Sequence, residues 1–466
     1  MSSHDNSSSS SGTDTIADPA IDDGPFAHIC DVPTTSSSEL TKSEAAVLGR
    51  HKTSHCKFRL TSTDLINCGY RPIKLKDNVH IEHKISVKSK SSQKPMPDVV
   101  QEITTTKTDI LKYLHCKEIR DTKKYCKTTV NNFDKVSSLI DRNIKYKSKL
   151  EADPALVDKN KKDLDSFQDV VFNREVLMNR ASLKLSNLNY AFGNIIGKAM
   201  KNDMSFADLC CAPGGFTYYL LSVFPKYKIN AYLTTMHNIN TFLPMNESLF
   251  TLGCRANINL SYGDICSDEY RQEFKNSISN KVNFVLADGG FDFSGNENYQ
   301  EYYSKNLYLA QMIMGMDIVR DGGFIICKFF DLYTTFSTTL MYVLSLMFDS
   351  ITICKPISSK AGNSERYVLF KNFQYNRSIV DYLKHVLIRN MCGCQYEQLM
   401  VNSLVDEELL TYKTFLDSIT KINKTIAMNQ SSALQKYLGI TKIINNTNNK
   451  NNAFSAFKLW HKLIKN

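Results

Sequence analysis

The run Asp208-Leu-Cys-Cys-Ala-Pro-Gly-Gly-Phe216 combines small, polar and glycine residues as a ligand-binding loop does. Gly214 and Gly215 have no Cβ, so the backbone there can approach a bound molecule closely. A glycine turn between a strand and a helix is a common nucleotide-binding device, although it also fits an ordinary tight turn. The spacing is not GxGxxG and no Gly-Lys-Ser/Thr follows, which disfavours a dinucleotide oxidoreductase and a P-loop NTPase.

A second candidate contact is Asp264, which ends the strand-like run INLSYGD. A carboxylate at a strand end can accept a hydrogen bond from an adenine amino group or a ribose hydroxyl. The alternative role is the N-cap of the helix that follows, for which Asp268 is the better placed residue. We therefore expect Asp264 to face a ligand.

Four further charged residues lie at the ends of expected elements: Lys184, Asp288, Lys328 and Glu365. A lysine at the end of a buried strand is costly unless it is paired or used. Taken singly, Lys328 also fits a snorkelling lysine and Asp288 a turn residue before two glycines. All four beside a ligand loop indicate an active site.

These residue types suit methyl transfer to a ribose hydroxyl, which is a poor nucleophile at neutral pH. A lysine ammonium can stabilise the developing alkoxide, or a lysine of lowered pKa can take the proton. A sulfonium methyl donor is already activated, so positioning in line supplies much of the catalysis. No metal is required, and the 13 cysteines show no zinc-type spacing.

The elements that must position these residues alternate between strand-like and helical patterns from residue 204 to 376. Strand-like runs lie at 204–210, 228–235, 258–264, 281–290, 322–330, 350–357 and 365–373, with helical patterns at 171–200, 299–320 and 333–348. This order predicts an α/β fold with a mostly parallel sheet and helices on both faces. Ligands bind such sheets at the carboxyl ends of the strands.

Four regions are expected along the chain: an acidic, Ser-rich disordered tail at 1–60, a basic and partly helical extension at 61–170, the α/β domain at 171–376 and a helical extension at 377–466. Within the basic extension, residues 108–150 are expected to be helical. Residues 101–150 hold twelve basic and six acidic residues. This stretch predicts an RNA-contacting surface, and a solvated helical face accounts for it equally well.

The 466 residues are 42% hydrophobic and 22% charged, which excludes a wholly disordered chain. There is no run of about 18 apolar residues and no apolar leader, so neither a membrane protein nor a secreted one is expected. The cysteines form no disulfide framework, which favours reduced thiols.

Several of these segments together resemble the FtsJ-like (RrmJ-type) ribose 2′-O-methyltransferases, and within them the eukaryotic cap-specific mRNA enzymes. They are ADLCCAPGGFTYYLL, LMNRASLKLSNLN, YGDI, ADGGFDFSGNENYQEYYSKNLYLAQMIM, IVRDGGFIICKFFDLYTTFS and KPISSKAGNSERYVLFK, which span residues 175–371. The resemblance implies a Rossmann-like, S-adenosylmethionine-dependent methyltransferase fold. It places the family's Lys-Asp-Lys-Glu tetrad on Lys184, Asp288, Lys328 and Glu365, with Lys328 as the central base or alkoxide stabiliser.

The resemblance also implies ligands. It places S-adenosyl-L-methionine against Asn179, Asp208, Cys210, Cys211, Ala212, Pro213, Gly214, Gly215, Phe216, Asp264 and Ile265. Capped RNA is expected to contact Lys117, Arg120, Asp121, Asn298, Tyr299, Gln300 and Asn363. The family commonly has an aromatic residue where this chain has Arg120, although an arginine plane can also stack on a base.

The implied activity is methylation of the first transcribed nucleotide of capped mRNA, giving cap 1. The segment FSGNENYQE favours capped mRNA over rRNA. The alternatives are methylation of the second nucleotide (cap 2), methylation of an rRNA or tRNA ribose, or a catalytically silent RNA-binding scaffold. Expected partners are capped mRNA and RNA polymerase II or other capping machinery, with no membrane. The expected site of action is the nucleus, or the cytoplasm for an enzyme of a cytoplasmic virus.

Overall fold

In the computed structural model, the described residues fall within the second of two units along the chain, residues 72–466. They are residues 85–86, 99–104, 114–119, 134–153, 167, 177, 179–236, 256–293, 297–393, 400–406, 408–441 and 448–465. The tail expected at 1–60 lies outside these residues.

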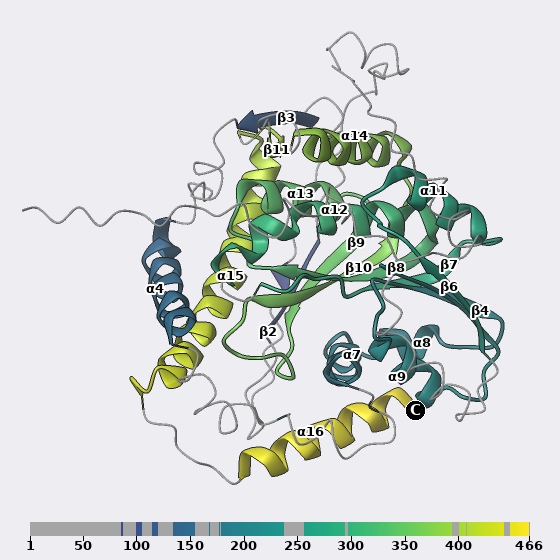
Figure 1. Cartoon of the computed structure of the whole chain (residues 1–466), viewed down its shortest axis with the longest axis horizontal. Helices are drawn as coiled ribbons and strands as arrows, with labels where there is room; N and C mark the ends of the chain where they lie inside the picture. Colours follow the sequence, from purple (N-terminus) through teal and green to yellow (C-terminus); the bar gives the residue numbers. More distant parts are fainter. Residues whose placement is uncertain are drawn as a thin grey trace, which may run out of the picture. The chain divides into compact units, whose positions relative to one another are not determined.

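The centre of this unit is a nine-stranded sheet (Figure 1). In spatial order its strands are β1 (Ile85–Ser86), β2 (Val99–Ile103), β9 (Phe348–Lys355), β10 (Glu365–Phe373), β8 (Val319–Phe330), β7 (Val282–Ala287), β4 (Met204–Leu209), β5 (Ile229–Thr235) and β6 (Ala256–Tyr262).

Seven of these nine strands run in one direction. Strands β6, β5, β4, β7 and β8 pair in parallel. Strand β10 is antiparallel to both β8 and β9, so β9 points the same way as β8. Strand β2 runs opposite to β9, and β1 opposite to β2. The mostly parallel α/β sheet expected from the sequence is therefore confirmed.

The order of the strands reverses next to β4. From β4 the chain first adds β5 and β6 on one side, and then β7 and β8 on the other. Such a reversal opens a crevice at the carboxyl ends of the two strands where it occurs. Cys210 follows β4 and Asp288 follows β7, so both candidate loops lie at this crevice.

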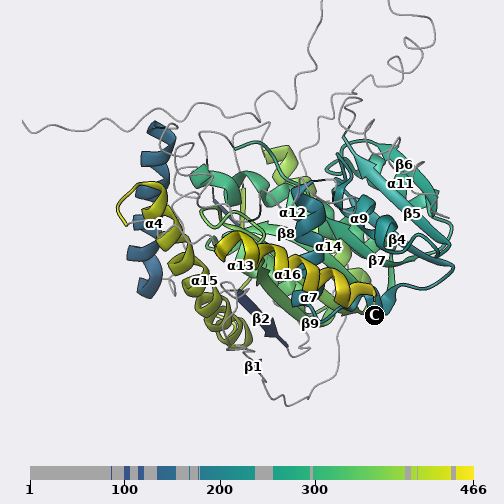
Figure 2. The same ribbon diagram turned by 90° about the horizontal axis from the view of Figure 1, so that it is seen from below.

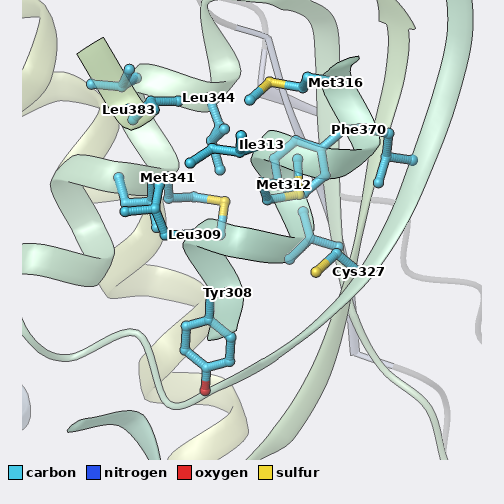
Figure 3. Packing of buried hydrophobic residues seen from close by; sticks show 14 of the residues in the cluster. Tyr308, Leu309, Met312, Ile313, Met316, Cys327, Met341, Leu344, Phe370 and Leu383 are labelled. Atoms are coloured by element: carbon cyan, nitrogen blue, oxygen red, sulfur yellow. The ribbon is translucent and has the colours of Figure 1, made fainter. Parts of the chain in front are cut away.

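One face of the sheet is covered by the helices α11 (Asp268–Ser277), α12 (Gln300–Ile318), α13 (Thr335–Ser345) and α14 (Arg377–Gly393). Helix α12 is buried along nearly its whole length because it lies between the sheet and the other helices. Figure 3 shows how its side chains meet those of the sheet, α13 and α14; the labelled residues are Tyr308, Leu309, Met312, Ile313, Met316, Cys327, Met341, Leu344, Phe370 and Leu383.

The opposite face is covered by α7 (Arg180–Ala191), α8 (Ile195–Ala199) and α9 (Gly215–Val223). The last helix, α16 (Asn448–Lys465), packs across α7 and α8 (Figure 2). Its Trp460 is buried and stacks on Phe167 at a ring-centroid distance of 5.7 Å. Helices on both faces are thus confirmed, and the C-terminal amphipathic segment belongs to the core.

The two extensions contribute strands as well as helices. Residues 108–150 have a helical pattern, but 114–119 form β3 (Leu114–Ile119), and α4 (Asp134–Ala152) covers the end of the stretch. Strand β3 pairs antiparallel with β11 (Met400–Val405) of the C-terminal extension. A helical prediction fails for β3 because cross-strand pairing, which a local pattern cannot show, decides its conformation.

Helix α15 (Leu410–Tyr437) links the extensions to the sheet. It packs against α4, α13 and β2. The Gln101 side chain on β2 donates to the Ser418 carbonyl, and Asn143 of α4 donates to the Ala427 carbonyl. These buried hydrogen bonds fix α15 against β2 and α4.

Candidate active site

A cavity of about 880 Å³ lies at the carboxyl ends of the parallel strands. Its wall includes nine residues that the sequence singled out: Cys210, Ala212, Asp264, Ile265, Asp288, Gln300, Lys328, Asn363 and Glu365. The cavity therefore joins the expected cofactor, catalytic and RNA-contacting residues in one space.

The four charged residues of the predicted tetrad form two ion pairs: Asp288, Lys328 and Glu365 line the cavity, and Lys184, which is not among its described lining residues, contacts Glu365. Lys184 Nζ lies 2.9 Å from Glu365 Oε2. Lys328 Nζ lies 3.1 Å from Asp288 Oδ1 and donates to the Asp288 carbonyl at 2.8 Å. All four side chains are largely buried, with Lys328 8% exposed. Residues 181 positions apart in sequence thus meet at the strand ends.

Tyr367 connects the two ion pairs, and the sequence reasoning missed it. Its hydroxyl donates to Asp288 Oδ1 at 2.7 Å and accepts from Lys184 Nζ at 3.3 Å. On β10 it stands two residues after Glu365 and directly opposite Lys328. Because alternate residues of a strand share a face, the spacing from Glu365 was the available signal.

Glu365 has further support from the loop before β10. Ser359 Oγ donates to Glu365 Oε1 at 2.8 Å. Lys355, at the end of β9, donates to Ser359 Oγ at 3.1 Å and to Asn363 Oδ1 at 2.5 Å. The side-chain oxygen of Asn363 is thereby occupied, so its side-chain nitrogen Nδ2 is the group that can meet a ligand. Lys355 and Ser359 were also missed by the sequence reasoning.

The network fixes the charge of its members. Burial acts to lower the pKa of Lys184, but the carboxylates of Glu365 and Asp288 outweigh it and raise that pKa. Burial acts to raise the pKa of Glu365, yet Lys184 and the neighbouring lysines lower it to about 2. Burial lowers the pKa of Lys355 to about 7. Lys184 is therefore a permanent cation at neutral pH.

Two glycines after β7 leave room for this arrangement. A Cβ on Gly290 would lie 2.8 Å from Lys328 Nζ, and one on Gly289 would lie 2.5 Å from Gln311 Oε1. The Gly289 amide donates to that same oxygen at 2.8 Å. Asp288-Gly-Gly is therefore a steric requirement of the site in addition to a turn.

The glycine loop after β4 is shaped by close packing. Gly214 has φ +100°, a conformation that favours glycine. A Cβ on Gly215 would lie 2.1 Å from Asn179 Oδ1, which caps α7 by accepting from the Ser182 amide. Asn179 thus sets the start of the helix that carries Lys184.

The remaining loop residues have structural contacts. Asp208 accepts from Thr217 Oγ1 at 2.7 Å, and burial raises its pKa to about 7. Phe216 is buried against Tyr367, and the Cys211 amide bonds the Thr234 carbonyl. Of the expected cofactor residues, Cys210, Ala212, Asp264 and Ile265 line the cavity, whereas Asn179, Asp208, Cys211, Pro213, Gly214, Gly215 and Phe216 are not among its described lining residues.

Asp264 faces the cavity with its carboxylate held in place. Its Oδ1 accepts from the Cys266 amide at 2.8 Å. The helix that follows, α11, is capped by Ser267, which accepts from the Tyr270 amide. Asp268 is the first helical residue, so the expectation that it is the cap was wrong by one position. Asp264 is thereby available to a ligand, and the acceptor suits a ribose hydroxyl or an adenine amino group.

The expected RNA contacts fall into four groups. Gln300 and Asn363 line the cavity. Asn298 donates to Ser148 of α4, and Tyr299 is 41% exposed beside the cavity wall. The backbone of Lys117 pairs with Ser403 in β3 and β11. Arg120 and Asp121 lie outside the described residues.

A pair of acidic side chains closes the far end of the cavity and was not anticipated. Glu151 of α4 and Glu297 of the 3₁₀ turn η4 (Glu297–Tyr299) both line it, together with Lys147. Burial and a carboxyl–carboxyl hydrogen bond with Glu297 raise the pKa of Glu151 to about 7. Two carboxyl groups in contact favour a cationic or proton-donating ligand.

Within the described part of the chain, no helix is long and apolar enough to span a membrane. The same residues hold no group of three or more His, Cys, Asp or Glu side chains suited to a metal ion.

Residues 177–373 match the family of FtsJ-like methyltransferases. The human cap-specific mRNA (nucleoside-2′-O-)-methyltransferase 1 is 36% identical over 235 residues, covering 46% of this chain and 28% of the relative. Cap-specific mRNA (nucleoside-2′-O-)-methyltransferase 1A of Caenorhabditis briggsae is 29% identical over 302 residues, covering 57% and 34%. The match therefore spans about a third or less of these curated relatives.

Among solved structures, a ribosomal RNA methyltransferase from Plasmodium falciparum has 21% sequence identity and a TM-score of 0.33. The similarity covers 42% of this chain and 99% of that protein.

Proposed function

We propose that the protein transfers a methyl group from S-adenosylmethionine to the ribose 2′-OH of the first transcribed nucleotide of capped mRNA, because residues 177–373 match the family of FtsJ-like methyltransferases. The observation that carries this proposal is the meeting of the Lys184–Glu365 and Lys328–Asp288 pairs through Tyr367 at the cavity. The names of the human and nematode relatives support a cap substrate.

The cofactor would lie over the carboxyl ends of β4, β5 and β6. The cavity wall there offers Cys210, Ala212, Asp264 and Ile265, and the Asp264 carboxylate is oriented to accept a hydrogen bond. Once bound, S-adenosylmethionine supplies a methyl group on a positively charged sulfur. The glycines of the loop allow close packing of the chain beneath it, since a Cβ on Gly215 would meet the Asn179 side chain.

Lys328 acts on the acceptor hydroxyl. Its ammonium lines the cavity and is held by the Asp288 carboxylate and carbonyl. A cation fixed beside the ribose oxygen stabilises the charge that develops as the O–H bond breaks and the O–CH₃ bond forms. The hydroxyl proton leaves to solvent. Lys184 stays charged and holds Glu365 and Tyr367 in place.

The acidic pair supports a capped end over an uncapped one. Glu151 and Glu297 lie on the same cavity as Gln300 and Asn363. A 7-methylguanine base carries a positive charge and presents N–H donors at its Watson–Crick edge, and carboxylates complement both. A triphosphate end, in contrast, would meet like charge there. The expected preference is for an N7-methylated cap.

As the sequence resemblance implies, we also propose a nuclear site of action.

The proposal is tested with labelled S-adenosylmethionine and three RNAs of one sequence that end in m7Gppp, Gppp or triphosphate. Digestion of the product then locates the label. The expected result is label on the first nucleotide of capped RNA. Label on the second nucleotide would indicate a cap 2 enzyme, and label on uncapped or internal ribose would indicate an rRNA- or tRNA-type activity.

A scaffold role is tested by replacing Lys328 with Ala. Lys371→Ala is the matched control, because Lys371 is an exposed lysine near the opposite end of β10 from Glu365. Loss of methylation in Lys328→Ala alone, with RNA binding retained in both variants, supports catalysis. Full cellular function of Lys328→Ala would establish the scaffold instead.

A further inference from the structure

The turn that follows the catalytic strand β8 has an unfavourable backbone. Asp331 has φ +48° and Leu332 has φ +72°, and both residues are buried. Successive non-glycine residues in the left-handed region are uncommon and persist where surrounding contacts hold them. This turn begins three residues after Lys328, so its conformation sets where the end of β8 lies.

The turn is held from the α12 side by Glu301. Its carboxylate accepts from the backbone amides of Tyr333 at 3.0 Å and Thr334 at 2.9 Å. These contacts anchor the residues after the turn but leave the Leu332 carbonyl for another donor.

That donor comes from the C-terminal extension. Asn423 on α15 is 0% exposed, and its Nδ2 donates to the Leu332 carbonyl at 2.8 Å. Its Oδ1 accepts from Arg366 Nη1, and Arg366 is itself fully buried. Arg366 directly follows Glu365 on β10, and its Nη2 lies 4.0 Å from Asp331 Oδ1. One amide group therefore holds the chain after Lys328 and the side chain next to Glu365.

The geometry matters because β8 and β10 are neighbours. Glu365 pairs with Phe330 and Tyr367 with Lys328 across the two strands. A shift of the turn or of Arg366 would move the two halves of the tetrad relative to each other. Helix α15 lies outside residues 177–373, so this support comes from a part of the chain beyond the matched domain.

We propose that Asn423 is a positioning residue for the catalytic tetrad, through which α15 sets the placement of Lys328 against Glu365. This inference rests on the proposed function for its kinetic readout. Asn423 is not among the described residues that line the cavity, so its effect must pass through the turn and Arg366.

Three variants test the proposal. Asn423→Ala removes both hydrogen bonds, whereas Asn423→Asp keeps an acceptor for Arg366 and loses the donor to Leu332. Asn390→Ala is the matched control: Asn390 is equally buried on α14, where its side chain accepts from the Val401 amide of β11. It removes a buried asparagine of the same extension away from the tetrad.

Rates are measured at a temperature where all variants are folded. We expect Asn423→Ala to lower kcat about 10- to 100-fold, the scale of a small misplacement of catalytic groups. Its KM for S-adenosylmethionine should be unchanged. Asn423→Asp should lie between it and the wild type, and Asn390→Ala should keep wild-type kcat. Equal kcat losses in Asn423→Ala and Asn390→Ala, or none in either, would overturn the proposal.

Hydrogen exchange gives a readout that does not depend on activity. Amides of residues 328–334 and 364–367 should exchange faster in Asn423→Ala than in Asn390→Ala. Unchanged exchange there would refute the positioning role even if the wild type proved inactive on capped RNA. An inactive wild type with the expected exchange difference would reject the proposed substrate and retain the positioning role.

Discussion

Replacing Tyr367 with Phe removes a hydroxyl that contacts both ion pairs and leaves the ring in place. The change deletes a 2.7 Å hydrogen bond to Asp288 and a 3.3 Å bond from Lys184. A hydrogen bond to a charged group contributes about 1.5–3 kcal/mol. If that loss falls on the transition state, kcat drops about 10- to 100-fold, since about 1.4 kcal/mol is tenfold. The assay is label transfer to m7Gppp-RNA at saturating substrates.

Tyr382→Phe serves as the control for this change. Tyr382 is buried on α14, and its hydroxyl donates to the Leu404 carbonyl at 2.8 Å, away from the cavity. Both variants should lose stability in a denaturant titration, but Tyr382→Phe should keep wild-type kcat. A Tyr367→Phe enzyme within about twofold of wild type would refute the claim that this hydroxyl orients Asp288.

Three further outcomes are expected. Gly290→Ala should lower kcat with little change in cofactor binding, because its Cβ would lie 2.8 Å from Lys328 Nζ; unaltered kcat would show that the ammonium can move freely. Burial raises the pKa of Asp208 to about 7. The protonated Asp208 therefore contributes to the free energy of unfolding below about pH 4, and this contribution should be lost as the pH rises toward 7. In urea unfolding, Asp208→Asn should reduce the dependence of the unfolding free energy on pH between about pH 4 and 7, and an unchanged dependence would contradict this expectation. Glu151→Gln should narrow the difference in KM between m7Gppp- and Gppp-RNA, because it removes an acidic group of the cavity wall that would complement the positively charged base; an undiminished preference would exclude this pair from reading the cap.

The strands and the tetrad could be predicted from sequence because each carries a local signal. The runs that end at Asp288 and Lys328 are apolar and bounded by glycines, and their polar last residues stand out against buried neighbours. The rule that parallel strands present their carboxyl ends at one edge accounts for Asp288, which follows β7, and for Lys328, which lies near the end of β8. The meeting of Lys184 with Glu365 was implied by the family resemblance, because Lys184 lies on helix α7 and Glu365 begins the antiparallel strand β10.

The supporting residues carried no such signal. From its local sequence, Tyr367 cannot be distinguished from an ordinary strand residue. Its role becomes clear only when its partner across the sheet, Lys328, is known. Asn423 lies in a polar helical segment 91 residues from Leu332, and Glu151 lies on a basic helix. Their roles come from long-range packing, which residue spacing alone does not encode. The conformation of β3 was misjudged for the same reason, since its partner β11 lies far along the chain.

The most direct test of the central claim uses the wild-type protein and capped RNAs that differ at single ribose positions. One m7Gppp-RNA lacks the 2′-OH of its first nucleotide, a second lacks that of its second nucleotide, and a third is all-ribo. The account predicts equal label on the all-ribo RNA and on the RNA with a 2′-deoxy second nucleotide, and none on the RNA with a 2′-deoxy first nucleotide. Undiminished label on that last RNA would contradict methylation of the first ribose.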